Sequence, residues 1–443
     1  MLLGLRRPYL FTLGYIYVDL VSPQRLSYYL LNSVPVSLIF FAAALGGWAL
    51  ADDKRDLRIA PRQILLAMLL GWCAYTTATA EVGWTIASEK WGWVWKSLVF
   101  AIFLPFTLRT KLRLEALLLF MALCAASIII VGGIKTLFSG GGYGSLNLMV
   151  DSNSGLYEGS TISTVAIALV PLILFLMRFG TVFPPDWRVR LFGGALIFAC
   201  LLIPIGTEAR TGLVCIAVLA LLMLRQSRRR FLYLGATAAA GLIAVPLLPS
   251  SFTSRMDTIQ NYQADNSAST RIAVWKWTWG YVRDHPLGGG FEVYRTNRLS
   301  FDVVRTQSAG NTEKVDATQS VQAGRAFHSS YFELLGEQGF PGFLLWIAIN
   351  IAGLVRMEVV RRRYGKADAG EAWVAPLATA LQHAQLIYLV GGAFVGIAFQ
   401  SFLYMVLAGQ IGLDTLLAAR RRKASPPRFA RLRPAPASGG APG

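Results

Sequence analysis

Apolar residues are gathered into uncharged blocks along the chain, and polar, often basic stretches separate one block from the next. Most blocks approach the length of about 20 residues with which an α-helix spans the roughly 30 Å hydrocarbon core of a bilayer. The pattern therefore predicts an all-α, polytopic membrane protein with about 12 transmembrane helices. The predicted spans are 8–22, 33–51, 63–81, 91–108, 115–137, 160–177, 191–206, 211–224, 231–249, 339–355, 375–397 and 400–418.

A long polar loop interrupts this pattern after the ninth predicted span. Loops of such length are usually functional or disordered. Apolar residues at helical spacing predict short helices inside it, with Ser269 or Thr270 as a cap and a stop before Pro286. We expect the helix around Trp275 to lie on the membrane surface or against the bundle, and the alternative is a packing helix with no role in ligand binding. The expected organisation is 1–249 for helices one to nine, 250–338 for the loop, 339–419 for the last three helices and 420–443 for a disordered basic tail.

The charge distribution indicates the orientation of the chain. There are 42 Lys+Arg and 24 Asp+Glu, a net charge of +18, yet only 15% of the residues are charged, against about 25% in soluble domains. Basic residues cluster in alternate connections, so the positive-inside rule predicts cytoplasmic termini and an extracytoplasmic loop. Because the clusters lie between apolar blocks and do not line one soluble face, we expect a lipid bilayer and no nucleic acid as partner.

Charged residues outside the basic clusters are the default functional candidates in a membrane protein. Arg210 lies in the outer turn TEARTG (207–212), where a helix is predicted to begin. A guanidinium beside a helix N-terminus suits an anion, because both the fork of donors and the backbone N–H groups point at phosphate oxygens. We expect Arg210 to act on an anionic substrate group, with Glu208 beside it in the site. The alternative is that Arg210 snorkels or pairs only with Glu208.

His328 lies where the long loop re-enters the membrane, just before Ser330 and Glu333, whose spacing predicts a capping box at a helix start. Of the 3 histidines, it alone is placed at an outer helix start. An imidazole, with a reference pKa of about 6.5, suits proton transfer near neutral pH. We therefore expect His328 to be catalytic and Glu333 to be a structural cap.

Further substrate-binding candidates come from the loop and from one span. Arg271, in the first turn of the predicted loop helix, is the best candidate for a second phosphate contact. Trp275 on the same helix and Arg325 before His328 are the other loop candidates, while most loop cations are expected to be solvated. Lys96 lies near the outer end of a span within a tryptophan belt, where ligand binding and snorkelling explain it equally well.

No metal or cofactor site is expected. The 4 cysteines all lie in apolar blocks and form no CxxC pattern, which argues against disulfides and zinc. The DDKRD sequence at 52–56 has the spacing of a magnesium-diphosphate site, but it is a single copy interleaved with bases in a predicted cytoplasmic loop. The glycine runs 140–142 and 288–290 lack the Lys-Ser/Thr of a phosphate-binding loop.

Several of these segments together resemble the O-antigen ligase/polymerase superfamily. They are TEARTG at 207–212, STRIAVWKW at 269–277, HPLGGGF at 285–291 and HSSYFELLGEQGFPG at 328–342. Their order and spacing make the set specific, and the resemblance covers about residues 160–350. LRRPYLFTLGYIYVDLVSPQRL at 5–26 and SRMDTIQNYQ at 254–263 are similar to the exosortase-associated O-glycosylation ligase branch.

The resemblance implies an inverting, metal-independent glycosyltransferase without cofactors in a bacterial inner membrane, with its active site facing the periplasm. It would transfer a glycan from undecaprenyl pyrophosphate to an acceptor hydroxyl of a lipid, glycan or protein in cell-surface polysaccharide assembly. By the same resemblance, Arg210 and Arg271 would hold the pyrophosphate and His328 would accept the acceptor's proton. The alternative function is a transporter or flippase of lipid-linked oligosaccharide, although such proteins commonly show two related halves.

Overall fold

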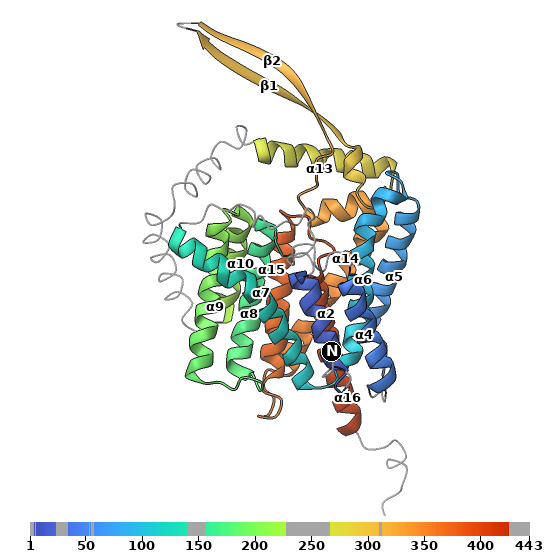
Figure 1. Ribbon diagram of the computed structural model, residues 1–443, viewed down its shortest axis with the longest axis vertical. Helices are drawn as coiled ribbons and strands as arrows, with labels where there is room; N and C mark the ends of the chain where they lie inside the picture. Colours follow the sequence, from blue (N-terminus) through green and yellow to red (C-terminus); the bar gives the residue numbers. More distant parts are fainter. Residues whose placement is uncertain are drawn as a thin grey trace, which may run out of the picture.

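The computed structural model describes residues 4, 6–23, 34–52, 54, 57–139, 156–226, 266–309 and 312–424. Its helices run side by side in one bundle (Figure 1). The bundle helices are α2 (Tyr9–Val21), α4 (Val36–Ala51), α5 (Pro61–Ala78), α6 (Trp84–Thr107), α7 (Lys111–Ser139), α8 (Gly159–Phe179), α9 (Trp187–Gly206), α10 (Arg210–Gln226), α14 (Ser330–Arg363), α15 (Val374–Gly392) and α16 (Ser401–Ala424).

Each bundle helix coincides with one of the predicted spans, within a few residues at most ends. Five of them, α7, α8, α9, α14 and α16, are long and apolar enough to cross a membrane by length and composition. The apolar helices α2 and α4 are shorter, with 13 and 16 residues. The described part of the chain is thus that of an all-α, multi-pass membrane protein, whereas the count of 12 spans stays a prediction. The predicted span 231–249, the glycine run 140–142 and the tail beyond residue 424 lie outside the described residues.

The long loop contains a helix and a β-hairpin. Helix α13 (Asn266–Asp284) lies across one end of the bundle, and the 3₁₀ turn η2 (Val293–Thr296) follows it (Figure 1). The antiparallel strands β1 (Arg298–Ala309) and β2 (Thr312–Ala323) project away from the bundle. One expectation for this loop was wrong, because the helix begins at Asn266, before the predicted caps. The hairpin is an element that the sequence did not predict, and its Val and Thr residues favour extended strands.

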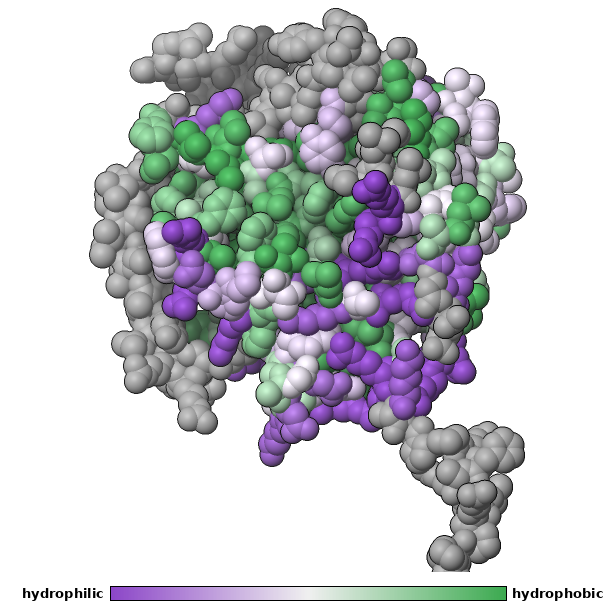
Figure 2. Space-filling view, turned by 60° about the horizontal axis from the view of Figure 1, so that its bottom comes forward, coloured by the Kyte–Doolittle hydropathy of each residue, from purple (hydrophilic) through white to green (hydrophobic). Residues whose placement is uncertain are grey.

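The connections between the helices gather at two opposite ends of the bundle. The first end, called here the basic end, carries the set Arg58, Arg109 and Arg420 and the set Arg178, Arg225 and Arg361. Figure 2, which brings the bottom of the first view forward, shows hydrophilic residues gathered there. The opposite end, called here the α13 end, lies beneath α13. Basic residues therefore collect at one end, as the charge pattern predicted.

Helix α8 is buried along residues 161–173, between α7, α9, α10 and α15. A helix that is apolar on every side is typical of such a buried place. Small residues let its neighbours approach closely at the α13 end. A Cβ on Gly391 of α15 would lie 2.4 Å from Thr164, and one on Gly212 of α10 would lie 2.9 Å from Ser163. The starts of α8 and α10 and the end of α15 therefore meet at the α13 end.

Candidate functional site

Helix α14 is interrupted at the α13 end of the bundle. Gly339 has φ 61° and ψ −167°, so residues 330–338 form a separate helical stretch before the helix continues to the basic end. The carbonyl of Gln338, which the break removes from the helix, accepts a hydrogen bond from Trp72 Nε1 at 2.8 Å. Breaks of this kind persist when neighbouring helices satisfy the freed backbone groups. The break therefore sets the direction of the stretch 330–338.

The glycine run 288–290 docks its backbone onto this break. Gly289 N donates to Gly336 O at 3.0 Å, and Gly290 N donates to Glu337 O at 2.9 Å. A Cβ on Gly288, whose φ is 83°, would lie only 2.4 Å from Gly339 N. Glycine is required here because only a residue without a side chain permits both the positive φ and the close backbone approach. The run thus positions the segment that follows α13.

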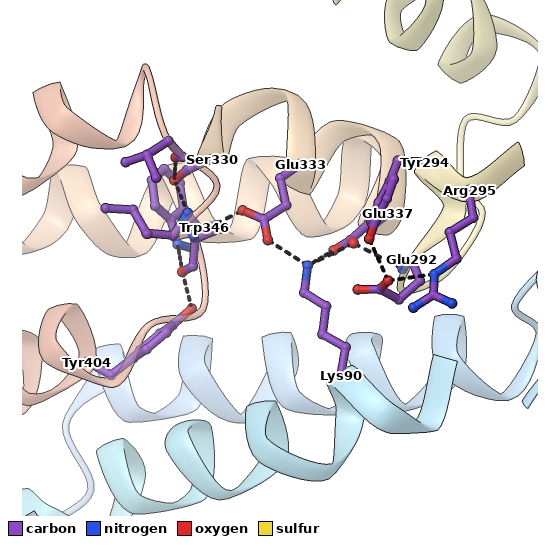
Figure 3. Close-up of polar contacts among 12 residues, drawn as sticks. Lys90, Glu292, Tyr294, Arg295, Ser330, Glu333, Glu337, Trp346 and Tyr404 are labelled. Atoms are coloured by element: carbon purple, nitrogen blue, oxygen red, sulfur yellow. Dashed lines mark hydrogen bonds and ion pairs between the residues drawn. The ribbon is translucent and has the colours of Figure 1, made fainter. Parts of the chain in front are cut away.

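A buried lysine connects the elements beneath this segment. Lys90 Nζ lies 2.6 Å from Glu333 Oε1 and 2.7 Å from Glu337 Oε2. Figure 3 shows Lys90 pointing between the two glutamates. The two glutamates are four residues apart and thus share one face of the helical stretch. Glu337 also accepts the backbone N–H of Glu292 at 3.1 Å, and Glu333 accepts that of Ala398 at 3.2 Å. We call Lys90, Glu333 and Glu337 the Lys90 cluster; it holds four separate segments together.

The capping role expected for Glu333 was wrong. Ser329 is the N-cap residue of α14, and no side chain caps this helix start. Ser330 Oγ donates instead to Val395 O at 2.9 Å, and Glu333 pairs with Lys90. The spacing of Ser330 and Glu333 is compatible both with a local capping box and with partners on other segments. The sequence alone therefore could not reveal that both side chains bind distant partners.

A cleft with a volume of about 610 Å³ lies next to the Lys90 cluster. It is rich in carboxylates and aromatic rings, and it contains one histidine. The lining residues are Glu89, Lys90, Trp93, Glu158, Thr161, Glu292, Tyr294, Arg295, Ala326, Phe327, His328, Glu333, Glu337, Val395, Gly396, Ile397 and Gln400. They come from α6, the start of α8, η2, the start of α14 and the connection between α15 and α16. The cleft is therefore assembled from parts of the chain that are far apart in sequence.

His328 lies in the cleft lining, in a segment that Trp275 of α13 contacts. Its φ of 49° is left-handed, which is uncommon for a non-glycine residue and often occurs at functional sites. Trp275 Nε1 donates to the carbonyl of Phe327 at 2.9 Å, and the Trp275 ring stacks on Phe332 with the centroids 5.0 Å apart. Helix α13 thus holds the segment just before α14 in place through Trp275.

The surroundings of His328 keep its imidazole neutral. Desolvation by the surrounding protein is the largest influence and lowers the pKa of His328 below its ordinary value. The positive charges of Arg271 and, more weakly, Arg325 lower this pKa further, while Glu158 opposes them. A histidine with a lowered pKa is uncharged at neutral pH and can accept a proton.

Three further predicted site residues, Arg210, Glu208 and Lys96, lie outside the cleft lining. Arg210 is the first residue of α10 at the α13 end, and its turn is held against α8 by a 2.9 Å hydrogen bond between the Thr207 and Ser163 hydroxyls. Glu208 in that turn has φ 50°. Neither Arg210 nor Glu208 lines the cleft. Lys96 of α6 also lies outside the cleft lining, and its ammonium is 3.4 Å from Ser37 Oγ of α4.

Several residues of the cleft were not among the candidates from sequence. Arg295 Nε and the Tyr294 hydroxyl each donate to Glu292 Oε2 at 2.9 Å. Burial and the Glu292 charge raise the pKa of Tyr294 to about 12. Two of these residues could have been suspected from the sequence, although only weakly. Lys90 is a charged residue directly before a predicted span, and Glu337 shares a helix face with Glu333, four residues before it. Among the residues that the structure describes, no group of three or more His, Cys, Asp or Glu side chains could hold a metal ion.

Comparison with known families divides the chain into two matched parts. Residues 1–181 match a family of unknown function, DUF5935, and residues 194–347 match the family described as O-antigen ligase. The chain has no match among curated proteins. The second match includes Arg210, α13, the hairpin, His328 and the interrupted start of α14. Membership of the exosortase-associated branch stays a prediction. Through its residues 194–347, the chain carries the domain of the O-antigen ligase superfamily, a family of membrane glycosyltransferases and ligases.

Proposed function

We propose that this protein is an inverting membrane glycosyltransferase. It transfers a glycan from undecaprenyl pyrophosphate to an acceptor hydroxyl of a lipid, glycan or protein. The observation that carries the proposal is the position of His328 in the cleft lining, where burial first and the charges of Arg271 and Arg325 second lower its pKa. The two arginines also suit a pyrophosphate. The O-antigen ligase match over residues 194–347 supports it.

The reaction needs one proton acceptor and one set of cations. His328 takes the acceptor's hydroxyl proton as the oxygen attacks the anomeric carbon of the donor glycan. The bond from that carbon to the pyrophosphate oxygen breaks with inversion, and its electron pair leaves with the pyrophosphate. Preorganised guanidinium groups stabilise the charge that develops there. Arg271 and Arg210 are assigned to this role, and Arg325 assists. No nucleotide, metal ion or other cofactor takes part in these steps.

The proposed orientation places the basic end in the cytoplasm and the α13 end in the periplasm of a bacterial inner membrane. The arginines collected at the basic end support it, since short cytoplasmic connections of membrane proteins carry an excess of Lys and Arg. Both chain termini are then cytoplasmic. The donor's polyprenyl chain stays in the bilayer, while its glycan reaches His328 from the periplasmic side.

The test uses purified protein in lipid nanodiscs with a lipid-linked oligosaccharide donor and a hydroxyl acceptor. We expect undecaprenyl pyrophosphate and the glycosylated acceptor to appear together, and Arg210→Ala to abolish both while insertion stays normal. EDTA should leave turnover unchanged. Loss of turnover that magnesium restores would contradict the metal-free mechanism. Movement of intact donor across a liposome bilayer without pyrophosphate release would favour a flippase and overturn the proposal.

A further inference from the structure

We infer that the two sides of His328 serve different substrates, and that the acidic cleft is the acceptor subsite for a neutral or amino sugar. This inference rests on the proposed function. It keeps the pyrophosphate with the arginines outside the cleft lining, Arg210, Arg271 and Arg325, and it disfavours acceptors with an anionic sugar at the reacting end. The contacts on each side of His328 support this division.

The cationic side is formed by α13 and the segment before α14. Arg271 precedes Trp275 by four residues, so the two share one face of α13. Trp275 Nε1 bonds to Phe327 O, which places that face against the backbone at His328. Arg325 is held nearby because Asn297 bonds both its N–H, at 3.0 Å, and its carbonyl, at 2.7 Å. Neither arginine belongs to the cleft lining. The cations therefore approach His328 from outside the cleft.

The cleft side is acidic. Five glutamates line it, against Lys90 and Arg295. Both of these cations already contact carboxylates. The Lys90 ammonium lies between Glu333 and Glu337, and Arg295 lies 2.9 Å from Glu292 and 3.6 Å from Glu89. A phosphate or carboxylate entering this cleft would face like charges, and such juxtaposition costs affinity. The lining therefore disfavours both pyrophosphate and acidic sugars.

The same lining suits a sugar ring that is uncharged or carries an ammonium group. Carboxylates accept hydrogen bonds from hydroxyl and ammonium donors, and the amide of Gln400 adds a planar group that both donates and accepts. Trp93 and Tyr294 supply aromatic surface for the apolar face of a pyranose. The volume of about 610 Å³ is within the range of small-molecule sites, about 300–1,000 Å³. The acceptor's terminal sugar fits the cleft in size and chemistry.

The experiment compares three lipid acceptors that differ only in their terminal sugar: a neutral hexose, a hexosamine and a uronic acid. One lipid-linked donor and the wild-type protein in nanodiscs are used throughout. We expect kcat/KM for the uronic acid to be at least about tenfold lower than for the neutral sugar, corresponding to about 1.4 kcal/mol. The hexosamine should react as well as the neutral sugar or better.

Glu89→Lys tests whether the cleft causes this preference. Glu89 is 68% exposed, so the change should not affect folding, and it places a cation in the lining. We expect the discrimination against the uronic acid to shrink severalfold. The matched control is Asp284→Asn, which removes an exposed carboxylate at the end of α13 outside the cleft and should leave the discrimination unchanged.

The outcomes separate the inference from the proposed function. Pyrophosphate release with equal or better use of the uronic acid would overturn the inference and leave the glycosyltransferase standing. An unchanged preference in Glu89→Lys would also overturn it, because the cleft would not contact the acceptor. No release with any of the three acceptors would defeat the proposed function and the inference together.

Discussion

Two ionic clusters brace α14, one near each end of the bundle, and their charges are reversed. In the Lys90 cluster, one ammonium lies between two carboxylates. In the second, called here the Asp414 cluster, one carboxylate lies between Arg62 of α5 and Arg356 of α14, with Arg356 Nε 2.8 Å from Asp414 Oδ1. Each cluster joins α14 to other helices, so their bracing role is the same. What differs is the space that each cluster borders.

The Lys90 cluster borders the cleft, whereas the Asp414 cluster continues into a chain of amides. Arg62 Nη1 donates to Gln410 at 3.2 Å, Gln410 donates to Gln385 at 2.8 Å, and Gln385 donates to Asn350 at 2.9 Å. No residue of the Asp414 cluster lines the cleft. Buried ion pairs are weak evidence for net stability by themselves. The comparison therefore distinguishes a structural brace near the basic end from a brace that borders the proposed reaction site at the α13 end.

The largest expected effect lies at the α13 end, in His328→Ala. Removing the proton acceptor should lower kcat about 10²- to 10⁴-fold, the range typical of a positioned base. Donor affinity should change far less, because the arginines remain. Single-turnover kinetics in nanodiscs separate the two quantities. His285→Ala, at an exposed histidine near the end of α13, is the matched control and should stay near wild type. A kcat of His328→Ala within a few-fold of wild type would remove the basis for a functional α13 end.

Lys90→Met should combine a loss of stability with a loss of activity. It leaves two buried carboxylates without their cation, and breaking a buried pair in this way costs about 3–5 kcal/mol of unfolding free energy. The helical stretch that follows His328 loses its brace, so turnover of the folded fraction should also fall. Thermal unfolding in detergent and turnover per folded molecule measure the two effects. Adding Glu337→Gln should restore part of the stability; if the double variant is no better than Lys90→Met, the cluster is not the cause.

Asp414→Asn should lower stability without changing the chemistry. We expect a loss of about 3 kcal/mol, at the lower end of the range for buried pairs, because Gln410 still accepts a bond from Arg62 and Arg356 is 42% exposed. Turnover per folded molecule should match wild type, in contrast to Lys90→Met. The same unfolding and turnover measurements apply. A drop in turnover as large as that of Lys90→Met would show that the two clusters do not differ in role.

The smallest effect is a shift in pH dependence. The pKa of His328 is lowered by its surroundings and by Arg271, so its proton-accepting form persists below the ordinary histidine value of 6.5. As the pH falls, turnover should therefore stay constant at the ordinary histidine pKa and decline only at lower pH, where His328 becomes protonated. Arg271→Gln removes one positive charge and should move the decline to higher pH, whatever its effect on donor binding. A profile that does not move would mean that Arg271 lies too far from His328 to act on it.

The sequence by itself determined the helices and most of the proposed reaction residues. A bilayer accepts only segments that satisfy their own backbone hydrogen bonds, so uncharged apolar blocks become helices whatever their neighbours are. The bounds of α8, predicted as 160–177 and found as Gly159–Phe179, follow from this. His328 and Arg271 stood out because they lie at predicted helix starts outside the basic clusters. These properties depend on residues that are close together in the chain.

Only the tertiary structure decided the partners of the charged side chains and the function of the glycine run. Glu333 was assigned a local cap, but its partner Lys90 lies 243 residues earlier in the chain. The run 288–290 gave no local sign that it packs against the break at Gly339. The acidic cleft likewise forms only where α6, α8, η2 and α14 converge. An ion pair or a close backbone approach depends on how distant helices pack, and local sequence patterns do not encode that packing.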